Sequence, residues 1–254
     1  MTCKIDYRPS ADLLAGRILL VTGAGDGIGR AAALAFAGHG ATVILLGRTI
    51  AKLETVYDEI EAAGGPQPAI FPLNLEGATL KDYHDMAETL DKAFGRLDGI
   101  LHNAGLLGRI TPFEQYNPEL WEQVMQVNIN GPIWMTQALL PLLKRSPDAS
   151  VVFTSSSVGR RGRAYWGAYT VSKFATEGFV EVLADEVDHL GTLRINSLNP
   201  GATRTAMRKA AYPGENEMHL RTPEEIMPTY LWLMGPDSRG HNNEKFDAQP
   251  TKPA

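Results

Sequence analysis

Cysteine is nearly absent from the sequence, since Cys3 is the only one among 254 residues. A single cysteine excludes a disulfide framework and a cysteine metal site within one chain, and it suits a reducing compartment. Long apolar runs are also missing: none approaches the about 20 residues that span a bilayer, and residues 1–16 lack the apolar segment of a signal peptide. We therefore expect a cytoplasmic protein with neither a membrane partner nor a metal ion.

Positive charge is scarce as well. Lysine and arginine number 24 against 29 aspartates and glutamates, which gives a net charge of −5. The basic residues are scattered apart from Arg160, Arg161 and Arg163, so the sequence lacks the basic patch of a nucleic-acid-binding protein. We expect no nucleic-acid partner.

The length and the hydrophobic content of 44% suit a single domain, 1–254, with a substantial core.

Short apolar segments alternate with segments of helical periodicity. The apolar segments are RILLVTG, ATVILLG, PAIFPLN, LDGILHNAG, ASVVFTSSS and TLRINSLNPG. Few of them alternate apolar with polar residues, which is typical of strands covered on both faces. Helical spacing lies between them, as at Leu80, Tyr83, Ala87, Leu90 and Phe94. The alternation predicts a Rossmann-type α/β fold, a doubly wound parallel sheet that binds ligands at the carboxyl ends of its strands.

Two segments lack a clear period. Residues 202–220 are the candidate for a substrate loop that closes over the site and excludes water. Residues 236–254 are polar and rich in turn formers, and we expect a C-terminal tail there.

The segment ILLVTGAGDGIGRAAALAF predicts a strand, a glycine-rich turn and a helix. Glycine lets the backbone approach a pyrophosphate, which the free N–H groups at a helix N-terminus attract. The spacing is T-G-x-x-x-G-x-G rather than G-x-G-x-x-G, and glycines also serve turns that bind nothing. The strand before and the helix after favour a dinucleotide held by the residues of this turn: Gly23, Gly25, Asp26, Gly27, Ile28 and Gly29.

The end of the next predicted strand indicates which nicotinamide cofactor is bound. An acid there binds the ribose 2′-hydroxyl of NAD(H), whereas an arginine binds the 2′-phosphate of NADP(H). TVILLGRT ends in Arg48 with no acid beside it, so NADP(H) is favoured and NAD(H) is the alternative. Arg48 could also be an ordinary solvated arginine, and the negative charge of Asp26 counts against a phosphate nearby.

The stretch YWGAYTVSK holds a candidate acid and a cation that tunes it. Tyr169 and Lys173 stand four residues apart and are neighbours on one helix face, whereas Tyr165 is two turns from Lys173. A tyrosine hydroxyl titrates near pH 10, and a close opposite charge shifts a pKa by about one to three units. Lys173 is therefore expected to lower the pKa of Tyr169. The alternative is a helix with one buried aromatic ring and one lysine that reaches solvent.

Six motifs stand in one order along the chain: TGAGDGIG, HNAG, VNING, SSS, YTVSK and NPGATRT. In their order and spacing they resemble the short-chain dehydrogenase/reductase family, in its compact single-domain branch, from about residue 17 to about residue 235. VILLGR, LHNAGLLG, FTSSSVGR, YLWLMG and FDAQP look similar to the bacterial YciK group of oxidoreductases within it. The resemblance implies a mostly parallel, seven-stranded sheet and an NAD(P)-dependent enzyme that interconverts carbonyls and alcohols.

The resemblance implies four catalytic residues. The serine thirteen residues before the tyrosine, Ser156, would hold the substrate oxygen, and Tyr169 would protonate it as hydride arrives. Lys173 would lower the pKa of that tyrosine and bind the nicotinamide ribose. The main-chain carbonyl of Asn128 would hold a water in a proton relay. Pro132, four residues later, lacks the N–H that would otherwise bond that carbonyl, although a proline kink made for packing explains it equally.

The resemblance also implies further cofactor contacts beyond the glycine turn and Arg48. Asn74 stands where the family usually has aspartate, so it brings no charge to the adenine, and FDAQP replaces the family's DGG. The nicotinamide ribose would contact Tyr169 and Lys173. The remaining candidates follow the third, fourth and sixth predicted strands: Leu75, Asn103, Ala104, Gly105, Pro200, Gly201, Thr203 and Thr205.

The residues expected around the nicotinamide end suggest an apolar carbonyl substrate: Leu106, Leu107, Tyr165, Trp166, Met207 and Tyr212. Three nearby arginines, Arg160, Arg161 and Arg163, favour an anionic group instead, unless they are solvated or face another subunit. In the family, the helices near residues 118–145 and after Tyr169 pair between subunits, so a homodimer or homotetramer is expected. A cofactor-binding sensor on the same fold and a nucleotide-sugar epimerase or dehydratase are the competing functions.

Overall fold

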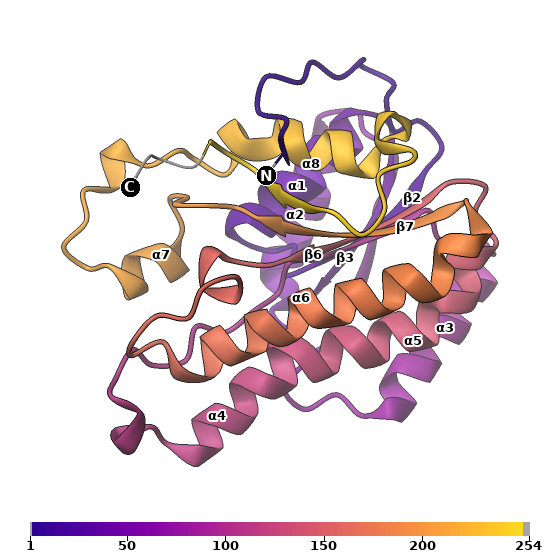
Figure 1. The fold of residues 1–254 in the computed structure, drawn as a ribbon. Helices are drawn as coiled ribbons and strands as arrows, with labels where there is room; N and C mark the ends of the chain where they lie inside the picture. Colours follow the sequence, from indigo (N-terminus) through magenta and orange to yellow (C-terminus); the bar gives the residue numbers. More distant parts are fainter. Residues whose placement is uncertain (1, 251–254) are drawn as a thin grey trace.

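The computed structural model describes residues 2–250, which form one parallel sheet with helices on both faces (Figure 1). The strand order is β1-β8-β7-β6-β5-β2-β3-β4, and every neighbouring pair is parallel. The strands are β1 Thr2–Cys3, β2 Ile18–Thr22, β3 Thr42–Gly47, β4 Ala69–Pro72, β5 Gly99–His102, β6 Ala149–Thr154, β7 Leu193–Asn199 and β8 Lys245–Asp247. The predicted doubly wound, Rossmann-type fold is confirmed.

The described sheet has eight strands rather than the seven expected. The additional strand is β1, a two-residue segment that pairs with β8 at the sheet edge. β8 lies inside the segment 236–254 that was expected to be a tail. Phe246 and Ala248 are fully buried there, so this polar segment completes the sheet, while residues 251–254 lie outside the described residues.

Two layers of helices cover the sheet (Figure 1). The helices α1, α2 and α8 pack on one face, and α3, α5 and α6 pack on the other. Both faces of β2 are buried, since Leu19 and Val21 contact the first layer and Leu20 the second, as expected for a central parallel strand. The α-helices are α1 Gly27–Gly38, α2 Ile50–Ala62, α3 Leu80–Phe94, α4 Pro118–Met125, α5 Gly131–Lys144, α6 Gly167–Val187, α7 Ala206–Ala211 and α8 Met227–Met234.

The helix expected near residues 118–145 is interrupted in its middle. α4 and α5 are joined by a π-helical segment, Gln126–Asn130, in which the Gly131 N–H bonds the carbonyl of Gln126 five residues earlier. Pro132 has no N–H for the carbonyl of Asn128, so the regular α-helical bond is missing there. π-Helical turns inside α-helices occur often at functional sites. Short 3₁₀ helices complete the described structure: Phe113–Gln115, Ser157–Gly159, Asp188–Leu190, Glu217–His219, Glu224–Ile226 and Pro236–Ser238.

Neither a membrane span nor a metal cluster is found in the described part of the chain. No helix within residues 2–250 is long and apolar enough to cross a bilayer. No group of three or more histidine, cysteine, aspartate or glutamate side chains in that range is arranged to hold a metal ion.

Candidate active site

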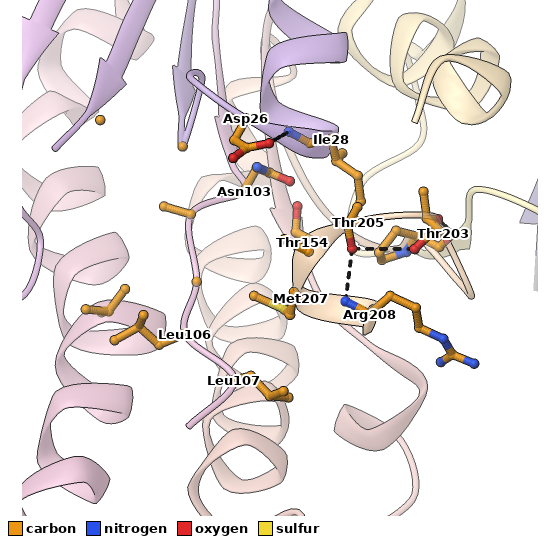
Figure 2. A pocket seen from close by; sticks show the side chains of 18 of the residues that line it. Asp26, Ile28, Asn103, Leu106, Leu107, Thr154, Thr203, Thr205, Met207 and Arg208 are labelled. Carbon is orange, nitrogen blue, oxygen red and sulfur yellow. Dashed lines mark hydrogen bonds between the residues drawn. The ribbon is translucent and has the colours of Figure 1, made fainter. Parts of the chain in front are cut away.

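A cavity of about 530 Å³ opens at the carboxyl ends of the strands, the place where this architecture binds ligands. Figure 2 shows side chains that line it, from the glycine turn after β2, the segment after β5 and the start of α7. All the predicted catalytic and cofactor-binding residues except Gly29 and Asn128 line this cavity. The sequence therefore predicted residues that come together around one cavity, although most of them lie in six different connections between strands and helices.

The glycine turn brings backbone to the cavity wall. Gly23 and Gly27 have positive φ angles, 68° and 51°, which favour glycine. A Cβ on Gly23 would lie 3.1 Å from the Cα of Ala104. Gly29 lies beneath the turn, where a Cβ would lie 2.1 Å from the Gly23 carbonyl oxygen, so it permits close packing of α1 rather than ligand contact. Asp26 caps α1 by accepting a bond of 2.7 Å from the Gly27 N–H (Figure 2).

Three groups at the end of β3 and the start of α2 line the cavity: Arg48, Thr49 and Lys52. The Lys52 ammonium forms an ion pair of 2.5 Å with Asp26, and this hydrogen bond holds the pKa of Asp26 below its usual range. The charge of Asp26, which counted against a nearby phosphate, is thus partly neutralised within the protein. The sequence interpretation missed Lys52, although its position four residues after Arg48 was a usable signal.

Ser156, Tyr169 and Lys173 meet on the cavity wall. The Ser156 hydroxyl and the buried Tyr169 hydroxyl share a hydrogen bond. Nζ of Lys173 donates to the Thr154 carbonyl over 2.6 Å and lies 5.6 Å from the centre of the Tyr169 ring. The i, i+4 spacing on α6 and the end of β6 therefore place a hydroxyl pair beside a buried ammonium.

Burial dominates the titration of both ionisable groups. It raises the pKa of Tyr169 to about 12, and the hydrogen bond with Ser156 opposes it. It lowers the pKa of Lys173 to about 8, and the charge of Glu177 opposes it. The prediction that Lys173 brings the pKa of Tyr169 below its usual value is wrong. The physical reason is that the loss of water around the hydroxyl outweighs its favourable contacts.

Asn128 is buried behind the cavity wall, in the π-helical segment. Its side-chain amide donates to the Leu106 carbonyl over 2.9 Å and to Ser172 Oγ over 3.1 Å, and its oxygen accepts 2.7 Å from the Leu106 N–H. The side chain therefore fixes the segment after β5 to α6. Its main-chain carbonyl is the group for which Pro132 provides no N–H.

Two polar side chains that the sequence interpretation missed hold segments that line the cavity. Thr22 Oγ1 accepts bonds of 2.9 and 3.0 Å from the N–H groups of Asn103 and Ala104. Gln249 Nε2 donates to the Pro200 carbonyl over 2.8 Å and to the Ala202 carbonyl over 3.2 Å. Gln249 of FDAQP thus supports the turn after β7.

The outer end of the cavity is largely apolar, with walls from Leu106, Leu107, Trp166, Met207 and Tyr212. Tyr165 was expected among them but does not line the cavity: it is 60% exposed, with a positive φ of 73° that turns the chain before α6.

The basic cluster after β6 does not act as one group. Arg160 is largely buried and forms ion pairs with Glu177 and Asp247, so it belongs to the interior rather than to a substrate or subunit face. Arg163 instead contacts the Tyr212 hydroxyl and stacks beside Trp166.

The predicted substrate loop, 202–220, contains the short helix α7 and lies over the cavity. Thr205 caps α7 by accepting 3.1 Å from the Arg208 N–H (Figure 2). Arg208 forms a two-pronged ion pair with Glu215 over 2.6 and 2.7 Å, and its guanidinium lies 3.8 Å from the Tyr212 ring centre. These contacts cap α7 and tie it to the residues that follow it.

Comparison with known proteins agrees with this geometry. A sequence profile described as short chain dehydrogenase matches residues 17–216. The chain belongs to the short-chain dehydrogenase family. This dehydrogenase is 56% identical over 244 residues to the uncharacterized oxidoreductase YciK of Escherichia coli K12, with 96% of each chain covered. The prediction of an oxidoreductase from this family is therefore confirmed.

Two solved structures of relatives carry a cofactor. A short-chain dehydrogenase from Shigella flexneri 2a, crystallised with NADP, superposes on the chain with a TM-score of 0.93 and 55% identity, covering 95% of this chain and 100% of its own. One from Escherichia coli CFT073, crystallised with NADPH, gives a TM-score of 0.93 and 56% identity over 95% and 100%.

Proposed function

We propose that this short-chain dehydrogenase interconverts a carbonyl compound and an alcohol by hydride transfer with NADP(H), with Tyr169 as general acid and base. One observation carries the proposal. The hydroxyl pair Ser156 and Tyr169, with Lys173 beside it, lies on the wall of the same cavity that contains the glycine turn and Arg48. The proposed proton donor and the residues proposed to bind the dinucleotide thus line the same cavity.

The protein groups fit NADP(H). The close backbone approach at Gly23 and the start of α1 suit a pyrophosphate, and Arg48 and Lys52 offer two cations to a 2′-phosphate. The relatives crystallised with NADP and NADPH support this choice. The cofactor, when bound, supplies or accepts the hydride. Lys173 and Tyr169 would hold its nicotinamide ribose, and Thr205 would meet the carboxamide end.

Tyr169 and Ser156 would act on the substrate oxygen. Ser156 would hold that oxygen by a hydrogen bond, and Tyr169 would give it a proton. Because its pKa is about 12, the Tyr169 hydroxyl keeps its proton at neutral pH. This protonation state suits reduction of a carbonyl, in which tyrosine is the acid. The carbonyl of Asn128 would hold the water that returns the proton through Lys173.

The apolar outer cavity supports a substrate with an apolar body.

The outer surfaces of α5 and α6 carry exposed large apolar side chains, namely Trp134, Val171, Phe174 and Val182. Side chains of this kind are typical of subunit interfaces, so we propose a homodimer or homotetramer through these helices. Sedimentation analysis of wild type and of a Phe174→Glu variant checks the proposal: the variant should dissociate.

The competing function is a sensor that binds NADP(H) without turning it over. A panel of ketones, aldehydes and alcohols with NADPH or NADP separates the two, with turnover followed at the absorbance of NADPH and cofactor binding by calorimetry. Turnover of any member supports the enzyme. Tight NADPH binding without turnover of any member would favour the sensor instead.

A further inference from the structure

Glu177 is a buried carboxylate on α6, one helical turn after Lys173, and the proposed chemistry does not use it. It accepts hydrogen bonds from the hydroxyls of Ser155, at 2.5 Å, and Ser197, at 2.8 Å. It also pairs with Nε of Arg160 at 3.2 Å. Ser155 and Arg160 lie in the connection from β6 to α6, and Ser197 lies on β7. One carboxylate on α6 thus joins this connection to β7.

The network continues to the turn after β7. Arg160 Nη1 forms an ion pair of 2.9 Å with Asp247 on β8. Asn199 Nδ2 donates to the same Asp247 oxygen over 2.8 Å, and its own oxygen accepts 3.1 Å from the Gly201 N–H. Ser155, Asn199 and Gly201, which the network fixes, all line the cavity, so the network holds segments of the cavity wall in place.

Charged and polar groups surround the Lys173 ammonium on two elements. From β6 the Thr154 carbonyl accepts its hydrogen bond, and from α6 the Tyr169 ring lies beside it. Neither of these groups carries a negative charge at neutral pH. Glu177, on the same helix, is the carboxylate whose charge favours the protonated lysine.

Glu177 itself faces cations from three elements. Arg160 comes from the connection after β6, Lys245 from β8 at 3.8 Å, and Lys173 from its own helix. Ion pairs with Arg160 and Lys245 hold the buried carboxylate in place, one helical turn from Lys173.

We propose that Glu177 is a positioning residue for the candidate active site: it keeps the Lys173 ammonium charged and, through Ser155, fixes the end of β6 from which Ser156 extends. The part concerning Ser156 rests on the proposed function, whereas the charge on Lys173 is a property of the protein itself. Glu177 acts through these neighbours and touches no reacting atom.

The charge on Lys173 can be measured without any substrate. NMR of protein with ¹³C-labelled lysine, assigned by the signal missing in Lys173→Met, reports the titration midpoint of its ammonium. In Glu177→Gln, which has nearly the same shape, the midpoint should fall by about one unit. The charged variant Glu177→Asp should stay close to wild type even though its shorter side chain weakens the Ser155 contact, and the exposed Glu181→Gln should match wild type. An unchanged midpoint in Glu177→Gln would overturn the proposal.

A pH profile of kcat separates positioning from a merely structural role. With the substrate found in the panel, turnover of Glu177→Gln should decline with rising pH at a lower pH than turnover of wild type. A structural role alone would lower kcat by the same factor at every pH, and that result would count against the proposal. If wild type turns over no substrate, the proposed function fails, but the NMR midpoints still decide whether Glu177 holds the charge on Lys173.

Discussion

The two ends of the sheet both bury charge, but they treat it differently. At the amino ends of the strands, Asp148 pairs with Arg17 at 2.7 Å, with Arg239 at 3.2 Å and with Arg194. Ser146 and Asp98 extend this cluster with a hydrogen bond of 2.6 Å. At the carboxyl ends, Lys173 bonds a neutral carbonyl. Direct ion pairs neutralise Asp148, whereas the Lys173 ammonium on the cavity wall bonds a neutral carbonyl.

This difference distinguishes a cluster that stabilises the fold from the groups proposed to take part in the reaction. A carboxylate among three guanidinium groups is fixed and chemically inert. Burial lowers the pKa of Lys173 to about 8 and raises the pKa of Tyr169 to about 12, and both side chains line the cavity. Thr154 Oγ1, buried beside the cavity, has no hydrogen-bond partner among the described residues. Changes at the carboxyl end should therefore affect activity, and changes at the amino end should affect stability.

The largest effect is expected from Tyr169→Phe. The change removes the proposed proton donor, and general acid catalysis contributes about 10²- to 10⁴-fold, so turnover should fall by that factor. The free energy of unfolding should change by no more than about 1.5 kcal/mol, since one hydrogen bond is lost. Tyr165→Phe is the matched control, because Tyr165 is exposed and outside the cavity. Wild-type turnover in Tyr169→Phe would contradict the proposed acid.

Asp148→Asn should instead lower the free energy of unfolding. Three arginines lose their counter-charge, and breaking a buried ion pair costs about 3–5 kcal/mol in the free energy of unfolding. Urea denaturation at one protein concentration measures this loss, and NADPH affinity should stay at the wild-type value. Asp91→Asn is the control, because its ion pair with Arg145 is half exposed and should contribute less than about 1 kcal/mol. Equal losses of unfolding free energy in the two variants would contradict the proposed difference between the two ends of the sheet.

A smaller effect is expected at the adenosine end of the cavity. Arg48→Ala and Lys52→Ala should each raise the Kd of NADPH about ten- to hundredfold, because a hydrogen bond to a charged group contributes about 1.5–3 kcal/mol. The Kd of NADH, which lacks the 2′-phosphate, serves as the control and should not change. Calorimetry measures both constants. If NADH binding weakens equally, Arg48 and Lys52 do not read the phosphate.

The effect that is smallest at neutral pH concerns the titration of His102, at the end of β5. Burial lowers its pKa to about 3. An unfolded histidine titrates near about 6.5, so the unfolded chain takes up a proton that the folded chain excludes, and stability should decline as pH falls from about 6.5 toward 3. His102→Asn should flatten this decline, whereas His84→Asn on the exposed side of α3 should not. Urea denaturation across this range checks it, and identical slopes in all three proteins would contradict the assignment.

The tautomer of His102 follows from its neighbours. The Thr136 hydroxyl donates to the Pro132 carbonyl over 2.7 Å, so its oxygen is left to accept from Nε2 of His102 at 2.9 Å. The proton therefore resides on Nε2. His102 thus braces the helix at the proline that follows Asn128, which is a structural role, as expected for a lone buried histidine.

The sequence was sufficient where spacing along the chain decides geometry. Tyr169 and Lys173 are neighbours because they are four residues apart on α6, and the glycine turn follows from the strand and helix around it. Contacts between distant residues were not predictable: Lys52 is 26 residues from Asp26, and Gln249 is 49 from Pro200. β8 was not predicted because the strand is short and the residues around it are polar, a pattern typical of a tail. Its pairing with β7 is visible only in the folded structure.

The pKa of Tyr169 was predicted with the wrong sign for a similar reason. The i, i+4 spacing reveals the nearby ammonium but not the burial of the hydroxyl, which depends on packing from several elements. Tyr165 was misplaced because its positive φ turns the chain away from the cavity, and such a conformation is uncommon for a tyrosine.

Transfer of deuterium from NADPH labelled at both C4 positions tests the central claim most directly. With the carbonyl substrate found in the panel, mass spectrometry should show one deuterium on the carbinol carbon of the alcohol for each NADPH consumed. The hydroxyl proton, which Tyr169 supplies, exchanges with solvent and carries no label. Alcohol without deuterium on that carbon would contradict hydride transfer by this protein.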